Sequence, residues 1–304
     1  MKKLLLALVS VAFLFTACNK EGVYTPKKKI SAVYYQKAGE DSKELLDIYH
    51  WNGKKLEAKM FRGSILSPYL HDFEVSPTYD GKRIVRVDET ITGDYVDFVY
   101  DGKFLSKLVY HSGNTMKEAT VEHKDGKISR IFFPAAQTTD NPCAEKLLAM
   151  FFPQSNIINI GKILSRNSKS LSVVDVELLF TWDGDNVSKI VNSILMDGVA
   201  IVSETSKLSY DDKINPYAAS WVDFGSEIQL TQNINGCRTL AMSKNNVTKI
   251  DYTGIIDLDF YDEPQVDAYV ENIEYEYDGK YPVKATYKYE NGNTDCYHYF
   301  EYIK

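Results

Sequence analysis

Short turns with almost the same sequence recur along this chain of 304 residues, and they constrain its fold more than any other feature. Each contains Asn-Gly or Asp-Gly, which follows Trp or Tyr in five cases and Lys in one. The six segments are Trp51–Lys54, Tyr79–Lys82, Tyr100–Lys103, Lys124–Lys127, Trp182–Asp185 and Tyr277–Lys280. Asn-Gly or Asp-Gly between extended runs is a strong signal for a type I′ hairpin, because both central residues of that turn need positive φ. The repeated turns therefore predict a long antiparallel meander.

The residues beside these turns alternate between apolar and polar side chains, with the period of a β-strand. The alternation is clearest at residues 96–100, 174–182, 272–277 and 283–289. Such a pattern predicts that one face of each strand is buried and the other lies in water. If the register follows the last turn, Glu274 and Glu276 face Lys284 and Lys288 across the hairpin.

The regular spacing of the turns breaks between Pro134 and Ser172. Inside this stretch an Asn-Pro pair opens an apolar run that Pro153 ends, so a short helix is expected over residues 141–152. We predict a mainly all-β fold, a long antiparallel β-meander forming a curved sheet or partly open barrel, with one short helical insert at about 134–172. The insert could also separate two lobes. The turn sequence is the same on both sides, which favours one continuous sheet with the helix on its concave face.

The N-terminus has the pattern of a secretory signal that ends in a lipidation site. Lys2 and Lys3 precede an uncharged run, Leu4–Ala17, which is too short to span a membrane. Phe15–Cys18 resembles the lipobox of bacterial lipoproteins, in which the cysteine carries lipid and becomes the first mature residue; the alternative is an ordinary signal with a chance cysteine. The predicted organisation is a signal peptide at 1–17, lipidated Cys18 with a tether at 18–29, and an antiparallel β domain at 30–304.

Charge and the residue after the cysteine indicate where such a protein is delivered. The formal net charge of −7 becomes −9 once Lys2 and Lys3 are removed. An acidic mature chain does not favour nucleic acid or an anionic lipid surface as a partner. Asn19 stands where Asp would resemble an inner-membrane retention signal, so the expected location is the outer membrane, reached through the N-terminal lipid anchor.

The cysteines and histidines indicate no catalytic or metal chemistry. If Cys18 carries lipid, Cys143, Cys237 and Cys296 remain, an odd number for an oxidising compartment. One pair could form a disulfide and leave a free thiol, or all three could be buried and reduced. Without Cys-x-x-Cys, Gly-x-Ser-x-Gly or His-Glu-x-x-His, we expect no metal, no cofactor and no enzymatic activity.

Three segments in the last third of the chain suggest a family. They are Tyr210–Tyr217, Leu240–Ile250 and Tyr277–Ala285. In this order they resemble a family of outer-membrane lipoproteins of Gram-negative gut anaerobes, a domain of unknown function with a porin-like fold that is described as lipid-binding. The resemblance extends over about Ile30–Lys304 and implies the fold more than the function, and it brings no catalytic residues. The Tyr-Asp turns are also similar to the YD repeats of large secreted toxins. Those arrays carry Arg-Leu after the glycine, which indicates convergence.

These features lead to two hypotheses of function. The first is a non-enzymatic membrane-anchored lipoprotein that binds a lipid-like or other hydrophobic ligand in a concave β-sheet. Its candidate ligand-binding residues are Leu147, Leu148, Phe151, Phe152, Ile160 and Ile163. The alternative is a surface glycan-binding or scaffold lipoprotein with Trp51 and Trp221 on an exposed aromatic platform. The aromatic residues directly before the turns are expected to pack on lysine stems of their own hairpins.

Overall fold

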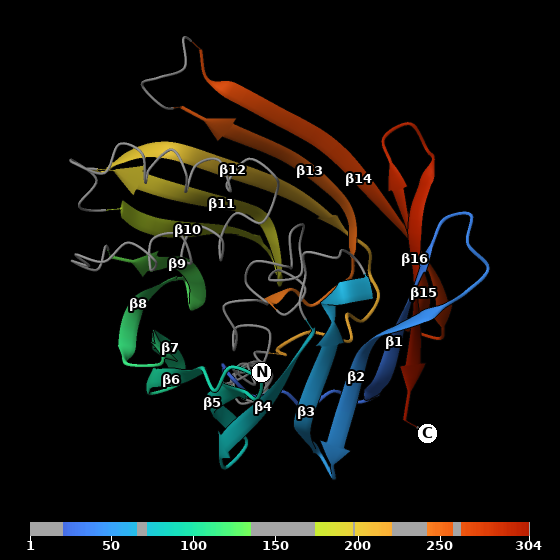
Figure 1. Cartoon of the computed structure of the whole chain (residues 1–304), viewed down its shortest axis with the longest axis horizontal. Helices are drawn as coiled ribbons and strands as arrows, with labels where there is room; N and C mark the ends of the chain where they lie inside the picture. The colour runs from blue at the N-terminus through green and yellow to red at the C-terminus, as the bar shows by residue number, and fades with distance from the viewer. Residues whose placement is uncertain are drawn as a thin grey trace, which may run out of the picture.

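The computed structural model describes residues 21–65, 72–134, 174–196, 198–220, 242–257 and 263–303. In this part of the chain sixteen strands form one closed antiparallel barrel. Each strand pairs with the next, and β16 pairs with β1, so the strands follow one another around a ring (Figure 1). The predicted meander is confirmed. The predicted curved sheet or partly open barrel is wrong, because the pairing of the first and last strands leaves no free edge.

The strands are mostly seven to twelve residues long. The first half comprises β1 (Ile30–Lys37), β2 (Glu44–Asn52), β3 (Lys55–Arg62), β4 (Asp72–Asp80), β5 (Arg83–Glu89), β6 (Tyr95–Asp101), β7 (Phe104–Ser112) and β8 (Thr115–Lys124). The second half comprises β9 (Lys127–Phe133), β10 (Val174–Asp183), β11 (Asn186–Met196), β12 (Val199–Tyr210), β13 (Val247–Ile256), β14 (Gln265–Asp278), β15 (Tyr281–Tyr289) and β16 (Thr294–Tyr302). A short 3-10 helix, η1 (Gly63–Ile65), follows β3.

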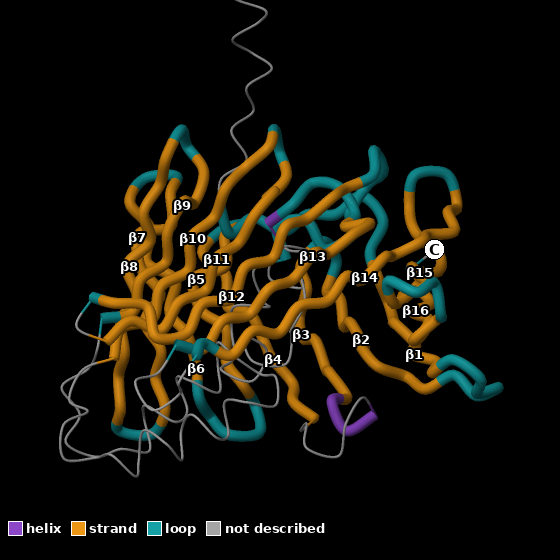
Figure 2. The backbone as a smooth tube through the Cα atoms, turned by 90° about the horizontal axis from the view of Figure 1, so that it is seen from above, coloured by secondary structure: helices purple, strands orange, loops and turns teal. Residues whose placement is uncertain are grey.

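The barrel has two different ends (Figure 2). Neighbouring strands run in opposite directions, so every connection from an even-numbered to an odd-numbered strand lies at one end, which we call the turn end. All six short turns lie there. The residues before β1, the β12–β13 connection and the last residues of β16 belong to the turn end for the same reason. The opposite end is called the loop end.

Five of the six turns differ in type from the prediction. Asn52 pairs with Lys55, so the central residues of the first turn are Gly53 and Lys54, and only Gly53 has a positive φ. A positive φ at the first central residue alone is typical of type II′. The same pattern occurs at Gly81, Gly102, Gly184 and Gly279. Among the six turns only Asp125-Gly126 has positive φ at both central residues, as type I′ requires.

The core lies inside the barrel. The buried hydrophobic side chains form one cluster to which all sixteen strands contribute, and only the interior of a closed barrel allows that. The predicted alternation is confirmed, as the buried run Val176, Leu178 and Phe180 on β10 shows. The predicted ion pairs across the last hairpin are also confirmed: Lys288 lies 2.6 Å from Glu274, and Lys284 lies 2.8 Å from Glu276.

Several predictions fall on residues outside the described ranges. These are the signal peptide, Cys18, the helix over 141–152 and the rest of the insert from residue 135 onward. The two-lobe alternative is wrong, because the strands before and after the insert belong to one barrel and β9 pairs with β10. In the part of the chain that the structure describes, no helix is long and apolar enough to cross a membrane.

Candidate functional site

The outer wall of the barrel carries charged side chains that pair between neighbouring strands. Arg86 on β5 donates to Asp97 on β6, with 2.6 Å between Nε and Oδ1. Arg130 on β9 donates to Glu122 on β8 at 2.7 Å and to Glu177 on β10 at 2.6 Å. A barrel that spans a membrane has an apolar outer band and a polar interior. This wall has the opposite polarity, charged outside and mainly apolar inside.

Aromatic side chains join neighbouring hairpins at the turn end. In seven of the eight even-numbered strands, an aromatic residue near the strand's end donates a hydrogen bond to a carbonyl near the start of the preceding strand. Trp51 donates through Nε1 to the carbonyl of Ile30 at 2.7 Å, and the Tyr79 hydroxyl donates to the carbonyl of Leu56 at 3.0 Å. The other donors and acceptors are Tyr100 and Ile84, Trp182 and Ile128, Tyr210 and Val187, Tyr275 and Val247, and Tyr302 and Pro282. We call these seven contacts the aromatic clasps.

Basic side chains lie over several of the clasp rings. The pairs are Lys29 over Trp51 at 5.4 Å, Lys55 over Tyr79 at 5.0 Å, Arg83 over Tyr100 at 4.2 Å and Lys127 over Trp182 at 5.1 Å. Each cation comes from the preceding hairpin or from the segment before β1. The prediction that these rings pack on lysines of their own hairpins is therefore wrong. The ring reaches across the boundary between two hairpins, where its hydrogen-bond acceptor lies.

A β-bulge also lies at the turn end of these strand pairs. Its extra residue is near the start of the odd-numbered strand, opposite the aromatic residue or His123 near the end of the even-numbered strand. In the β4–β5 hairpin Thr78 faces Arg86 but Tyr79 faces Ile84, so Val85 is an extra residue. Equivalent shifts occur in the hairpins β2–β3, β6–β7, β8–β9, β10–β11, β12–β13 and β14–β15. The extra residue allows side chains three positions apart, such as Ile84 and Val87, to be buried together. In three hairpins it is a serine whose hydroxyl donates to the opposite strand: Ser106 to Val99, Ser129 to Glu122 and Ser188 to Thr181.

The eighth even-numbered strand has His123 where the others have an aromatic clasp. Its Nε2 lies 3.0 Å from Oε1 of Glu21, and Oε2 of the same glutamate accepts a hydrogen bond from the backbone N–H of Leu105 on β7 at 2.5 Å. The carbonyl of Gly22 accepts from the N–H of Ile84 on β5 at 2.8 Å. The segment before β1 thus supplies the link between hairpins that β8 lacks.

The rest of that segment also packs on the barrel. Tyr24 is 2% exposed, its ring lies 5.6 Å from that of Trp51, and its hydroxyl donates to the carbonyl of Pro216 at 3.0 Å. Lys28 forms an ion pair with Asp278 at 2.8 Å. Residues 21–29 of the predicted tether are therefore docked across the turn end.

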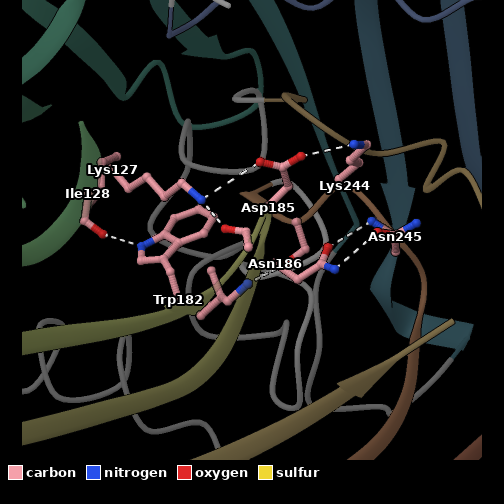
Figure 3. A network of polar contacts seen from close by, with 10 residues as sticks. Lys127, Ile128, Trp182, Asp185, Asn186, Lys244 and Asn245 are labelled. Carbon is pink, nitrogen blue, oxygen red and sulfur yellow. Dashed lines mark hydrogen bonds and ion pairs between the residues drawn. The ribbon is translucent and has the colours of Figure 1, made fainter. Parts of the chain in front are cut away.

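The described parts of the β12–β13 connection, residues 211–220 and 242–246, also pack at this end. Asn215 and Ser243 are buried, the side-chain amide of Asn215 donates to the Ser243 carbonyl at 2.8 Å, and the Ser243 hydroxyl accepts from the N–H of Val187 at 3.1 Å. Lys244 and Lys127 both reach Asp185 in the β10–β11 turn, as Figure 3 shows. The hydrogen bond from Lys244 holds the pKa of the Asp185 carboxyl below its usual range. We call residues 21–29, 211–220 and 242–246 together the cap.

The three segments that carry the family resemblance meet in this cap. Asp211 accepts from the backbone N–H of Asn246 at 3.1 Å and from the hydroxyl of Tyr277. The N–H of Ile214 donates to the carbonyl of Lys280 at 3.1 Å. These three segments therefore build one hydrogen-bonded network at the turn end of the barrel, which is a structural role.

A polar patch interrupts the apolar inner wall. Tyr252 on β13 donates to Glu204 on β12 at 2.8 Å, and its ring stacks on Tyr269 of β14 with 4.7 Å between centroids. Gly254 leaves the space that the Tyr252 side chain occupies, since a Cβ there would lie 2.7 Å from the tyrosine hydroxyl. An acceptor, a donor and two ring faces thus lie together on the inner wall.

Two further titratable groups lie on the same wall. Glu271 shares a strand face with Tyr269, and burial raises its pKa to about 7. Burial lowers the pKa of His298 on β16 to about 4, and its ring lies 4.7 Å from Tyr287 and 6.0 Å from Tyr35. At neutral pH the histidine is uncharged and Glu271 is partly protonated. We define the inner polar patch as Glu204, Tyr252, Tyr269, Glu271, Tyr287 and His298.

One ion pair is buried in the inner wall away from this patch. Nζ of Lys59 on β3 lies 3.5 Å from Oδ1 of Asp47 on β2, and both side chains are at most 10% exposed. The ammonium also lies 5.5 Å from the ring centre of Tyr49. Because both groups are buried, removing either one would leave a charge behind in the barrel interior and would lower the stability of the fold.

The residues predicted for a ligand site have different outcomes. Leu147, Leu148, Phe151, Phe152, Ile160, Ile163 and Trp221 lie outside the described residues, so the predicted hydrophobic site and the complete glycan platform stay predictions. Trp51 is part of a clasp and packs against Tyr24. Cys296 is buried with a free thiol, whose pKa burial raises, whereas Cys143 and Cys237 are not described. Among the described residues, no group of His, Cys, Asp or Glu is arranged to hold a metal ion.

Comparison with known proteins identifies the fold. No family model matches the chain, and no curated protein matches it in sequence. A porin-like protein from Bacteroides vulgatus is similar in structure, with a TM-score of 0.50 and 11% identity over 91% of this chain and 99% of that chain. A porin-like protein from Bacteroides uniformis gives a TM-score of 0.47 and 8% identity over 94% of this chain and 100% of that chain. At this identity the first likeness shows the fold alone, and it agrees with the porin-like fold that the sequence resemblance implied.

Proposed function

We propose that this protein is a non-enzymatic, lipid-anchored lipoprotein of the outer membrane whose barrel binds a lipid-like or other hydrophobic ligand against its inner wall. The observation that carries the proposal is the polarity of the wall. Ion pairs link neighbouring strands on the outer face, and buried apolar side chains line the inner face. A barrel of this polarity suits water outside and an apolar molecule inside.

The chemistry of the inner wall suits an amphiphile better than a pure hydrocarbon. Apolar side chains favour a tail by about 25 cal/mol for each Å² removed from water. The inner polar patch offers Glu204 and partly protonated Glu271 to a polar head group. Tyr269 presents an aromatic ring next to them.

The glycan alternative finds less support among the described residues. A sugar platform needs an exposed ring face. The ring of Trp51 already packs against Tyr24, with 5.6 Å between ring centroids, and the Lys29 ammonium lies 5.4 Å from its centre. Its indole N–H is already bonded to the Ile30 carbonyl. Trp51 therefore serves the turn end of the barrel.

Native mass spectrometry of protein purified without detergent tests the binding proposal. We expect a co-purified lipid, or uptake of the fluorescent fatty acid cis-parinaric acid by delipidated protein. Tyr269→Ala should weaken uptake about tenfold or more, because it removes an aromatic surface of the inner wall. The matched control is Tyr297→Ala on the outer wall, beside Lys284, which should leave uptake unchanged.

Circular dichroism must show that both variants remain folded. Absence of any bound lipid together with absence of uptake would refute the proposal. Equal losses in the two variants would also refute a site on the inner wall. Labelled palmitate tests the anchor separately: Cys18 should incorporate it, and Cys18→Ser should not.

A further inference from the structure

The segment before β1 leaves the barrel at a defined place. Glu21 is held by the backbone N–H of Leu105 and by His123, and the Gly22 carbonyl is held by the N–H of Ile84. Cys18 stands three residues before Glu21, and three extended residues span at most about 11 Å. A lipid on Cys18 would therefore emerge within about that distance of the turn end.

Exposed lysines surround the same end. In four turns Lys is the second central residue and stands at the tip: Lys54, Lys82, Lys103 and Lys280. Lys27, Lys124 and Lys244 are exposed there as well. Two of the aspartates at this end are neutralised by further lysines: Asp278 by Lys28, and Asp185 by Lys127 and Lys244. Across the cap and the six turns together, eleven lysines stand against nine acidic residues, a net charge of +2, whereas the chain as a whole has a net charge of −7.

We propose that the turn end of the barrel rests on an anionic membrane surface, with the lysines of the turn tips against lipid head groups and the loop end directed away. This inference rests on the proposed lipid anchor, which brings the turn end to the membrane. The charge of the whole chain argued against an anionic surface. The structure shows that lysines are gathered where the anchor would hold the barrel, and basic residues near an anionic leaflet attract it.

The height of the barrel makes this orientation measurable. Strand β7 runs from the turn end to the loop end and has nine residues. At about 3.4 Å per residue and a tilt of about 40°, its two ends differ in height by roughly 25 Å. Asp101 lies just before β7 at the turn end, and Asn114 lies just after it in the β7–β8 turn, both exposed.

Fluorescence resonance energy transfer to an acceptor in the bilayer compares the distances of these two positions from the membrane surface. The lipidated chain, with Cys143 and Cys237 changed to Ser and Cys296 to Ala, carries one fluorophore at Asp101→Cys or at Asn114→Cys. It is reconstituted in vesicles of phosphatidylcholine and phosphatidylglycerol that contain a head-group acceptor. We expect strong transfer from position 101 and weak transfer from position 114. Equal transfer, or stronger transfer from position 114, would overturn the proposal.

A matched pair of charge variants tests the lysine contact without the anchor. The chain from Asn19 to Lys304 contains every described residue and can be sedimented with the same vesicles at low salt. Changing Lys54, Lys82 and Lys280 to Gln should weaken binding at least about tenfold, since each charge near the surface contributes about fivefold. The control changes Lys37, Lys43 and Lys288 to Gln, three lysines at or next to the loop end, and should weaken binding less than about threefold.

The outcomes separate this inference from the proposed function. Equal effects of the two triple variants, or no binding to anionic vesicles at all, would refute the lysine contact. If Cys18 takes up no palmitate, the anchor fails while sedimentation still reports which end binds. If the barrel takes up no lipid, ligand binding fails while energy transfer still reports the orientation.

Discussion

The clasp at Tyr79 allows a test of how the hairpins are held together. Its hydroxyl donates to the Leu56 carbonyl at 3.0 Å, and burial raises its pKa to about 12, so the donor is protonated at neutral pH. Tyr79→Phe removes this hydrogen bond and keeps the ring under the Lys55 ammonium. The change therefore isolates one polar contact between two hairpins.

The expected loss follows from the burial of that contact. A hydrogen bond of this kind contributes about 1 kcal/mol net, and the carbonyl left without its donor keeps part of its desolvation cost. We expect Tyr79→Phe to lower the free energy of unfolding by about 1–1.5 kcal/mol, or roughly 2–4 °C in Tm for a chain of this size. Tyr302→Phe removes a clasp with no shared partner, so the double variant should lose about twice as much.

Urea unfolding followed by far-UV circular dichroism at pH 7 measures both losses. The control is Tyr34→Phe, whose hydroxyl is exposed and lies 3.4 Å from Glu301, and it should change stability by less than about 0.5 kcal/mol. A loss at Tyr79 no larger than that of the control would refute the view that the clasps join the hairpins.

Three further predictions concern the inner wall. Folding raises the pKa of Glu271 from 4.5 to about 7, so the folded state holds this proton more tightly and stability falls as pH rises through that window; Glu271→Gln should remove this dependence and stabilise the protein at pH 8 by up to about 3 kcal/mol in urea unfolding. Lys59→Met or Asp47→Leu alone should cost about 3–5 kcal/mol, because each leaves one buried charge, whereas the double variant should be near neutral; additive losses would contradict the pairing. Gly254→Ala should displace Tyr252 from Glu204 and lower both stability and parinaric acid uptake, and an unchanged protein would refute the close contact.

Local features of the fold were accessible from the sequence. The Asn-Gly and Asp-Gly turns located six hairpins, and alternation assigned the two faces of β10 and the Glu274–Lys288 pair, because both depend on neighbouring residues. The closure of the barrel could not be predicted from the sequence. It depends on Ile30–Lys37 finding Thr294–Tyr302 at the other end of the chain, and no local pattern encodes that pairing.

The details of the turn end were missed for a different reason. Strict alternation of buried and exposed residues makes no allowance for a bulge. It therefore does not place Ile84 and Val87, which are three residues apart, on the same buried face. The role of Glu21 was hidden because its partners, Leu105 and His123, are distant in sequence.

The sequence does contain a signal for two residues of the inner polar patch. Glu271 stands two residues before Ile273, on what alternation assigns as the buried face, and a carboxyl on such a face is a candidate for a shifted pKa. His298 shares its face with Phe300 in the same way. Which strands bring these residues together depends on the barrel, so the patch itself required the structure.

The polarity of the wall is the central claim, and detergent-free folding tests it most directly. The chain from Asn19 to Lys304 would be refolded in buffer without detergent and examined by light scattering and circular dichroism. An outer wall of ion pairs predicts a soluble, monomeric β-barrel with cooperative unfolding. A chain that aggregates in buffer and acquires its strands only in micelles or bilayers would contradict the account.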